Sequence, residues 1–203
     1  MVVRGKRRAV RQKPRKVVPA EVASVYQPLL RRLQGERHLL RTLGVTGCGS
    51  SGSTTVAMQL AATAAEQSDR PVLLVDAHLA RPAIAERFDA VFGCTLADLA
   101  DDRDSLDEVA QPASVANLHL ASLGPIEPAA LDGLLETLSP RFGLVIFDLP
   151  ELAVGSLALA SKLDGVLLVL AAGRTHHDIA QETLRRLERG RVQVLGAVLN
   201  HGV

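Results

Sequence analysis

A loop of small residues at positions 47–55 has the composition and spacing of a phosphate-binding site. It reads Gly-Cys-Gly-Ser-Ser-Gly-Ser-Thr-Thr and fits the pattern G-x-x-x-x-G-K-[ST] at Gly47, Gly52 and Thr54, with Ser53 in place of the lysine. Glycines let backbone N–H groups face an anion closely, and the N-terminus of a following helix adds a favourable dipole. The sequence therefore predicts a phosphate loop without its cation.

Two later motifs each place an aspartate at the end of an apolar run. They read Asp76-Ala-His-Leu-Ala-Arg-Pro82 and Leu144-Val-Ile-Phe-Asp148-Leu-Pro150. Open α/β sheets bind ligands at the carboxyl ends of their strands, although Asp76 taken alone fits a helix cap or turn equally well. Asp148 fits the Walker B pattern, in which the carboxylate holds Mg²⁺ directly or through water. We predict Asp76 and Asp148 as catalytic and metal-binding residues, with the Thr54 hydroxyl as a further metal ligand.

Short apolar runs alternate along the chain with helical patterns, and these elements must position the motifs. Segments 72–75, 144–147 and 166–170 are continuously apolar, as a parallel sheet covered on both faces requires. Such alternation predicts an α/β fold with a mostly parallel central sheet. The expected strands are 41–46, 71–76, 117–123, 144–148, 165–170 and 192–199, and the expected helices are 21–33 (weakened by Pro28), 54–67, 82–88, 95–100, 128–138, 156–163 and 177–188.

Composition limits the classes of function. With 203 residues, 47% of them hydrophobic, the chain is expected to form one globular domain. Four Phe, one Tyr and no Trp leave little for base-stacking recognition of nucleic acid. Two cysteines predict no disulfide framework and fit a reducing cytosol. No apolar run is long enough for a transmembrane helix, which needs about 18 residues or more.

The first residues of the chain differ from the rest in charge. Residues 1–16 carry eight Lys/Arg and no acid, while the remainder holds 15 Lys/Arg against 22 acids, a net charge of −7. We predict a disordered basic arm over residues 1–18 and a folded domain over 19–203. The arm is either a solvated tail or a contact for an anionic membrane surface, and nucleic acid is the less favoured partner.

With the three motifs in this order, the chain resembles the bacterial tyrosine kinases of capsule and exopolysaccharide synthesis, a branch of the MinD/ParA-like P-loop ATPases. The resemblance extends over residues 39–203 and includes the closing stretch Val194-Leu-Gly-Ala-Val-Leu-Asn200. It implies a three-layer P-loop NTPase fold, ATP or ADP with Mg²⁺, and a membrane-spanning polysaccharide chain-length (co-polymerase) partner. It also implies a cytoplasmic location, with attachment to the inner face of the membrane as one form of that location. The nucleotide-binding candidates are Gly49, Ser50, Ser51, Gly52, Ser53, Thr54, Thr55 and, as a base contact, Asn200.

The departures from that family all remove parts of kinase chemistry. Ser53 replaces the lysine, and His78 replaces the second aspartate of the family's D-x-D motif. Of the family's N-terminal E-x-x-R-x-x-R motif, only Glu21 is kept. The family's kinases usually end in a cluster of tyrosines, whereas the only tyrosine of this sequence is Tyr26. Phosphoryl transfer depends on positioning and charge stabilisation, so it should suffer more than binding. We expect a catalytically impaired nucleotide-binding or scaffold protein that binds nucleotide weakly or not at all.

Two alternatives remain open at the level of sequence. In the first, the chain is an active protein-tyrosine kinase or ATPase whose cation comes from elsewhere, with Lys162, Arg81 or a lysine of the basic arm as candidates. In the second, it is a ParA/MinD-like positioning ATPase whose basic arm binds DNA or a membrane. The second predicts binding that weakens steeply with salt and depends on residues 1–16.

Overall fold

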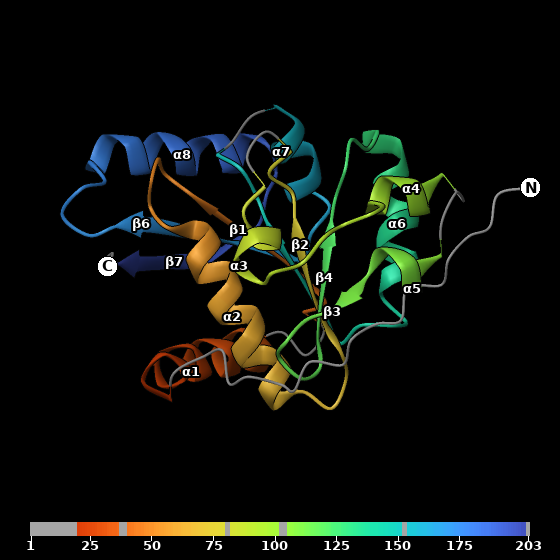
Figure 1. The fold of residues 1–203 in the computed structure, drawn as a ribbon. Coiled ribbons are helices and arrows are strands. Elements are labelled where there is room, and N and C mark those ends of the chain that lie inside the picture. The colour runs from red at the N-terminus through yellow and green to blue at the C-terminus, as the bar shows by residue number, and fades with distance from the viewer. Residues whose placement is uncertain (1–19, 37–39, 80–81, 102–104, 152–153, 202–203) are drawn as a thin grey trace, which may run out of the picture.

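A seven-stranded sheet forms the centre of the molecule, with helices on both of its faces (Figure 1). The computed structural model describes residues 20–36, 40–79, 82–101, 105–151 and 154–201. The basic arm predicted over residues 1–18 lies outside these ranges, so it stays a prediction. The strand order is β3-β4-β2-β5-β1-β6-β7, and every neighbouring pair is parallel except β3 with β4.

The sheet confirms the predicted α/β class and its mostly parallel strands. Strands β1, β2 and β5 are buried at every position, which explains why their sequences are uninterrupted runs of apolar and small residues. The strands are β1 (Thr42–Gly47), β2 (Val72–Asp76), β3 (Gln111–Pro112), β4 (Leu118–Ser122), β5 (Leu144–Asp148), β6 (Gly165–Ala171) and β7 (Val194–Asn200).

The helices divide into two layers. Helices α1 and α2, with the short α3, pack their apolar side chains on one face of the sheet, while α4 to α8 pack on the other. They are α1 (Ala20–Glu36), α2 (Ser53–Gln67), α3 (Ile84–Arg87), α4 (Leu96–Ala100), α5 (Leu106–Val109), α6 (Leu131–Leu138), α7 (Val154–Ala160) and α8 (His177–Arg189), with a 3₁₀ turn η1 (Pro128–Ala130) before α6. None of the described helices has the length and hydropathy needed to cross a membrane.

The differences from the sequence prediction concern short or interrupted elements. Helix α1 runs through Pro28, because Tyr26, Leu30 and Leu33 bury their side chains in the core beside α2. Two elements were not predicted, α5 and the two-residue strand β3, and both are too short to show a periodic pattern. All other expected strands and helices are present, with shifts of a few residues at their ends.

Candidate functional site

The three motifs meet at the carboxyl edge of the sheet. The phosphate-type loop follows β1, while Asp76 ends β2 and Asp148 ends β5. Because β5 lies between β1 and β2, Asp148 is paired in register with Val45 on one side and Asp76 on the other. The structure therefore places the loop and both predicted carboxylates side by side, as the sequence predicts for an open parallel sheet.

The loop has the backbone form of an anion site. Gly49 and Gly52 have φ values of 60° and 79°, in the left-handed region where only glycine fits without strain. Gly52 is the N-cap of α2, and its carbonyl accepts the N–H of Val56 at 3.1 Å. Ser53, Thr54 and Thr55 form the half-buried first turn of the helix, so their N–H groups lack intrahelical acceptors. These donors can bind an anion through the backbone alone.

Asn200 holds this loop from the end of β7. Its amide nitrogen donates to the Ser51 carbonyl at 2.9 Å, across 149 residues of sequence. A Cβ at Gly52 would lie only 2.5 Å from that nitrogen, so the contact leaves room for glycine alone. The resemblance implied a base contact for Asn200. In this structure the same side chain positions the loop, and the base contact stays a prediction.

Lys162, the one predicted replacement cation within the described residues, does not stand where the loop lysine would be. Ser53 is the first residue of α2 and carries no charge. Lys162 pairs with Asp132 at 2.6 Å, just before β6 begins and therefore at the opposite edge of the sheet. Strand β1 alone separates the two edges by about 17 Å at roughly 3.3 Å per residue. Arg81 lies outside the described residues.

A carboxylate, which sequence reasoning did not single out, occupies the loop. Glu151 accepts a hydrogen bond from the Gly49 N–H through Oε1. It follows the Asp148 motif directly, so an acid placed three residues after the motif aspartate was the available signal. Since phosphate oxygens would use the same kind of donor, Glu151 puts negative charge at a position that a nucleotide phosphate would need.

The two predicted carboxylates differ in their surroundings. Asp76 is 2% exposed, and its oxygens accept backbone N–H groups from His78 at 3.0 Å, Ala83 at 2.9 Å and Ile84 at 3.0 Å. It therefore holds the turn into α3, which is the capping interpretation that the sequence left open. Asp148 is 1% exposed, and neither of its oxygens has a hydrogen-bond partner among the described residues.

Asp148 is the better fit to a metal ion. Buried carboxylate oxygens without partners are costly, and Mg²⁺ with its waters would satisfy them. Within the described ranges, no group of three or more His, Cys, Asp and Glu side chains surrounds such an ion. A magnesium ion at this position would therefore take Asp148, the Thr54 hydroxyl, water and phosphate oxygens rather than an all-protein set of ligands. These metal roles, and that of Asp76, stay predictions.

His78 stands beside Asp148. Its Nε2 lies 3.6 Å from Asp148 Oδ1, and its side chain is 23% exposed. The neighbouring Asp148 carboxylate raises the pKa of His78 above its ordinary value, partly opposed by burial and assisted by the charge of Asp76. The residue that replaces a family carboxylate thus favours positive charge next to the remaining one.

We expect the stability of the protein to depend on pH through His78. Because the pKa of His78 is raised on folding, its contribution is fully present below the unfolded pKa, about 6.5, and is lost as pH rises through the folded pKa. Denaturant unfolding of the native protein and His78→Gln across this range should show a difference that shrinks with rising pH. Burial lowers the pKa of His119, which acts in the opposite direction in both proteins and cancels in the comparison. A difference that grows with pH would contradict the assignment.

The fold and site together define a P-loop NTPase. A MinD cell division ATPase from Pyrococcus furiosus superposes with a TM-score of 0.66 over 79% of this chain and 71% of that one, and at 19% identity it shows the fold alone. No protein-family model matches the chain. The predicted three-layer P-loop NTPase class is confirmed.

Within that class, the chain is a homologue of the bacterial tyrosine kinases. It is 27% identical to the tyrosine-protein kinase YwqD of Bacillus subtilis, over 81% of this chain and 73% of that protein. It is 35% identical to the tyrosine-protein kinase Ptk of Acinetobacter johnsonii, over 68% of this chain but only 20% of that longer protein. The kinase domain of the Escherichia coli tyrosine kinase ETK superposes with a TM-score of 0.77 at 26% identity, over 96% of this chain and 84% of that one.

Proposed function

We propose that this chain is a cytoplasmic, kinase-like protein of exopolysaccharide or capsule biosynthesis whose phosphoryl-transfer chemistry is impaired. It binds ATP or ADP with Mg²⁺ weakly or not at all and acts through protein contacts. The charge at the loop carries the proposal: Ser53 stands where a cation belongs, and the Glu151 carboxylate accepts the Gly49 N–H. The homology to tyrosine kinases supports the biological setting.

The charges at the site explain why transfer should suffer more than binding. Backbone N–H groups of the loop and a magnesium ion on Asp148 and Thr54 could hold a nucleotide, with Asn200 near its base. Transfer also needs positive charge on the moving phosphoryl group, since catalysis there is almost entirely positioning and charge stabilisation. Glu151 adds negative charge instead. Tyr26, the only tyrosine, is buried in α1, so it is a poor acceptor in the folded protein.

Two measurements on the unmodified protein test the proposal. Calorimetry with Mg-ATP should give weak or undetectable binding, and transfer of the γ-phosphate to a tyrosine-containing peptide should be far below that of a lysine-bearing relative assayed alongside. Turnover comparable to that relative would overturn the claim of impairment. Failure of the protein to associate with any polysaccharide co-polymerase would overturn the assigned setting and leave the enzymology unaffected.

An active enzyme with a relocated cation is the second candidate, and Arg174 favours it. This arginine follows β6 at the same edge of the sheet as the loop, and β6 pairs with β1 up to Gly47. If the enzyme is active, Arg174→Ala and Asp148→Asn should each abolish turnover. Lys162→Ala, at the far edge, is the matched control and should leave it intact. Turnover that survives Arg174→Ala would remove this arginine as the source of the cation.

The homology and the charge of the first residues support two proposed partners. We propose a membrane-spanning polysaccharide co-polymerase as the protein partner, and contact of residues 1–16 with an anionic membrane surface as a second attachment. Vesicle sedimentation should show binding to anionic vesicles that falls with salt and disappears when residues 1–16 are removed. Equal binding to neutral vesicles, or binding that survives the deletion, would contradict the membrane role.

A further inference from the structure

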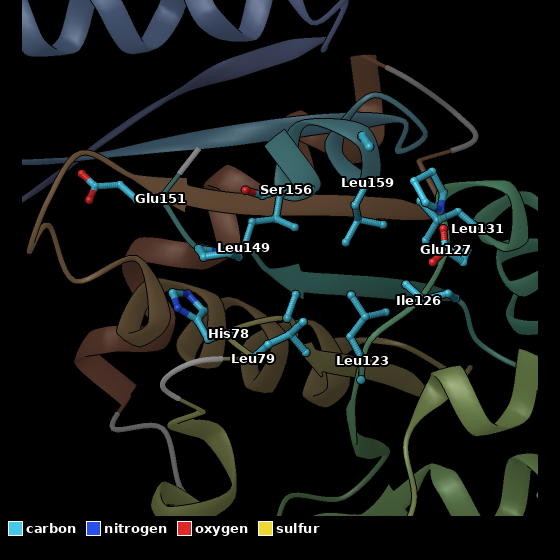
Figure 2. Close-up of a pocket in the computed structure, with 16 residues that line it drawn as sticks. His78, Leu79, Leu123, Ile126, Glu127, Leu131, Leu149, Glu151, Ser156 and Leu159 are labelled. Atoms are coloured by element: carbon cyan, nitrogen blue, oxygen red, sulfur yellow. The ribbon is translucent and has the colours of Figure 1, made fainter. Parts of the chain in front are cut away.

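A cavity of about 630 Å³ opens at the carboxyl edge of the sheet, on the face away from α2 (Figure 2). Its floor is made by residues that follow β2, β4 and β5, and its walls by α7 and by η1 with the start of α6. The volume falls within the range of sites for small organic ligands, about 300–1,000 Å³. The cavity borders the loop, because Glu151 lines it and also accepts the Gly49 N–H, while α2 packs on the other face of the sheet.

Leucine side chains line the floor and the walls of the cavity. Leu123 and Leu149 lie in the floor and Leu131 and Leu159 in the walls, and all four are otherwise buried in the core of this face. Leu79 stands at the rim with 59% of its surface exposed, although it is a large apolar side chain. A ligand with an apolar body would cover Leu79 and the floor together, and burial of that area would stabilise the complex.

The charged groups at the ends of the cavity indicate which ligand charge it favours. Glu151 and Glu127 are exposed carboxylates at opposite ends of the view in Figure 2. Among the described residues that line the cavity there is no Lys or Arg, and its one histidine, His78, faces Asp148 with Nε2 3.6 Å from Oδ1. An anion would therefore meet two like charges and a histidine already paired with a carboxylate, while a cation would find a carboxylate at either end.

We propose that this cavity binds a small organic amine with an apolar aliphatic or aromatic body. The body lies over the leucine floor, and the ammonium group pairs with Glu151 or Glu127. This site goes beyond the proposed function. Pairing at Glu127 does not involve the nucleotide loop, whereas pairing at Glu151 competes with its contact to the Gly49 N–H. Pairing of exposed charges changes affinity by up to about fivefold, so the charge should adjust an affinity that the apolar contact supplies.

Three probes that share one body test the charge preference. Phenylbutylamine, phenylbutanol and phenylbutyrate can be titrated into the full-length protein and followed by calorimetry or by NMR of its methyl groups. We expect the amine to bind about two- to fivefold more tightly than the alcohol, and the carboxylate to bind most weakly. Equal affinity for the three, or a preference for the carboxylate, would overturn the proposal.

Variants locate the binding in this cavity. Gly155 lies in α7 at the cavity wall, and nothing lies within 4 Å of a Cβ built there, so Gly155→Leu should fold and fill the space. Gly133→Leu in α6 has equally open surroundings outside the cavity and is the matched control. We expect the first to abolish binding of all three probes and the second to preserve it. The double change Glu127→Gln with Glu151→Gln should make the amine and the alcohol equal. Binding that Gly155→Leu leaves intact would contradict the site.

Discussion

Replacing Ser53 by lysine is expected to raise the affinity for Mg-ADP by about 30-fold or more. Loss of one partner of a close charge pair typically costs about 2–5 kcal/mol, which corresponds to 30-fold to several-thousand-fold. Ser53→Lys should recover at least the lower end of that range because Ser53 already opens α2 at the position from which a lysine reaches the outer phosphates. Calorimetry on the two proteins under the same conditions measures the gain.

Glu151 should limit this gain. Its carboxylate already accepts the Gly49 N–H, so an ammonium group introduced at position 53 can pair with it instead of with a phosphate. Adding Glu151→Gln to Ser53→Lys should therefore increase the affinity beyond the single change. Glu151→Gln alone should give a smaller increase, because it frees the loop without supplying a cation.

Ser50→Lys is the control for simple charge. Ser50 is exposed in the same loop but precedes Gly52 and the helix, so a lysine there adds the same charge at the wrong place. We expect a change of only a fewfold, in line with exposed charge pairs of about 0.2–1 kcal/mol. Equal gains from both substitutions would show that net charge matters and position does not. No gain from Ser53→Lys would contradict the missing lysine as the cause of weak binding.

The sequence determined the part of the site that depends on strand ends. The apolar runs that end at Asp76 and Asp148 predicted two neighbouring carboxylates at one edge of a parallel sheet, and the structure places them in register. The same patterning predicted the start of α2 after the glycine loop. These inferences succeed because a buried parallel strand has few alternatives in composition and its carboxyl end has a fixed place in the fold.

The use of each polar atom could not be read from sequence. Asp76 and Asp148 are the same residue type in similar sequence contexts. In the structure Asp76 accepts three backbone N–H groups, whereas Asp148 accepts none among the described residues. Glu151 and Asn200 reach the loop across about half and three-quarters of the chain, respectively, so a local pattern can single out these residues but not the contacts they make. Lys162 remained a candidate cation until its place at the far edge of the sheet was known. Tertiary packing decided each of these outcomes.

Asp76→Ala is expected to lower the free energy of unfolding by about 3 kcal/mol, whereas Asp148→Asn should leave it unchanged or raise it. Removing the Asp76 carboxylate leaves three backbone N–H groups without acceptors, two of them at the start of α3. Each buried group left unsatisfied costs about 1–3 kcal/mol, reduced where water can enter. Urea unfolding at about pH 8.5, well above the usual range of histidine titration, measures the change.

Asp148→Asn removes the charge of the other carboxylate, and we expect it to keep or raise the free energy of unfolding. Its oxygens are buried without hydrogen-bond partners in the described part of the chain, and the neighbouring base, His78 Nε2, lies 3.6 Å from Oδ1. Where His78 is neutral, the ionised carboxylate bears a desolvation cost that a neutral amide largely avoids. Mg²⁺ should stabilise the native protein against urea and should have no effect on Asp148→Asn. If Asp76→Asn folds but also loses the stabilisation by Mg²⁺, Asp76 is a metal ligand as well as a cap.

If Asp148→Asn destabilises the protein as much as Asp76→Ala does, then the Asp148 carboxylate has a structural role in the fold and is not available to a ligand. A buried carboxylate that costs stability yet stands beside an anion loop is what a retained binding site would show, because groups that destabilise the fold concentrate where function needs them.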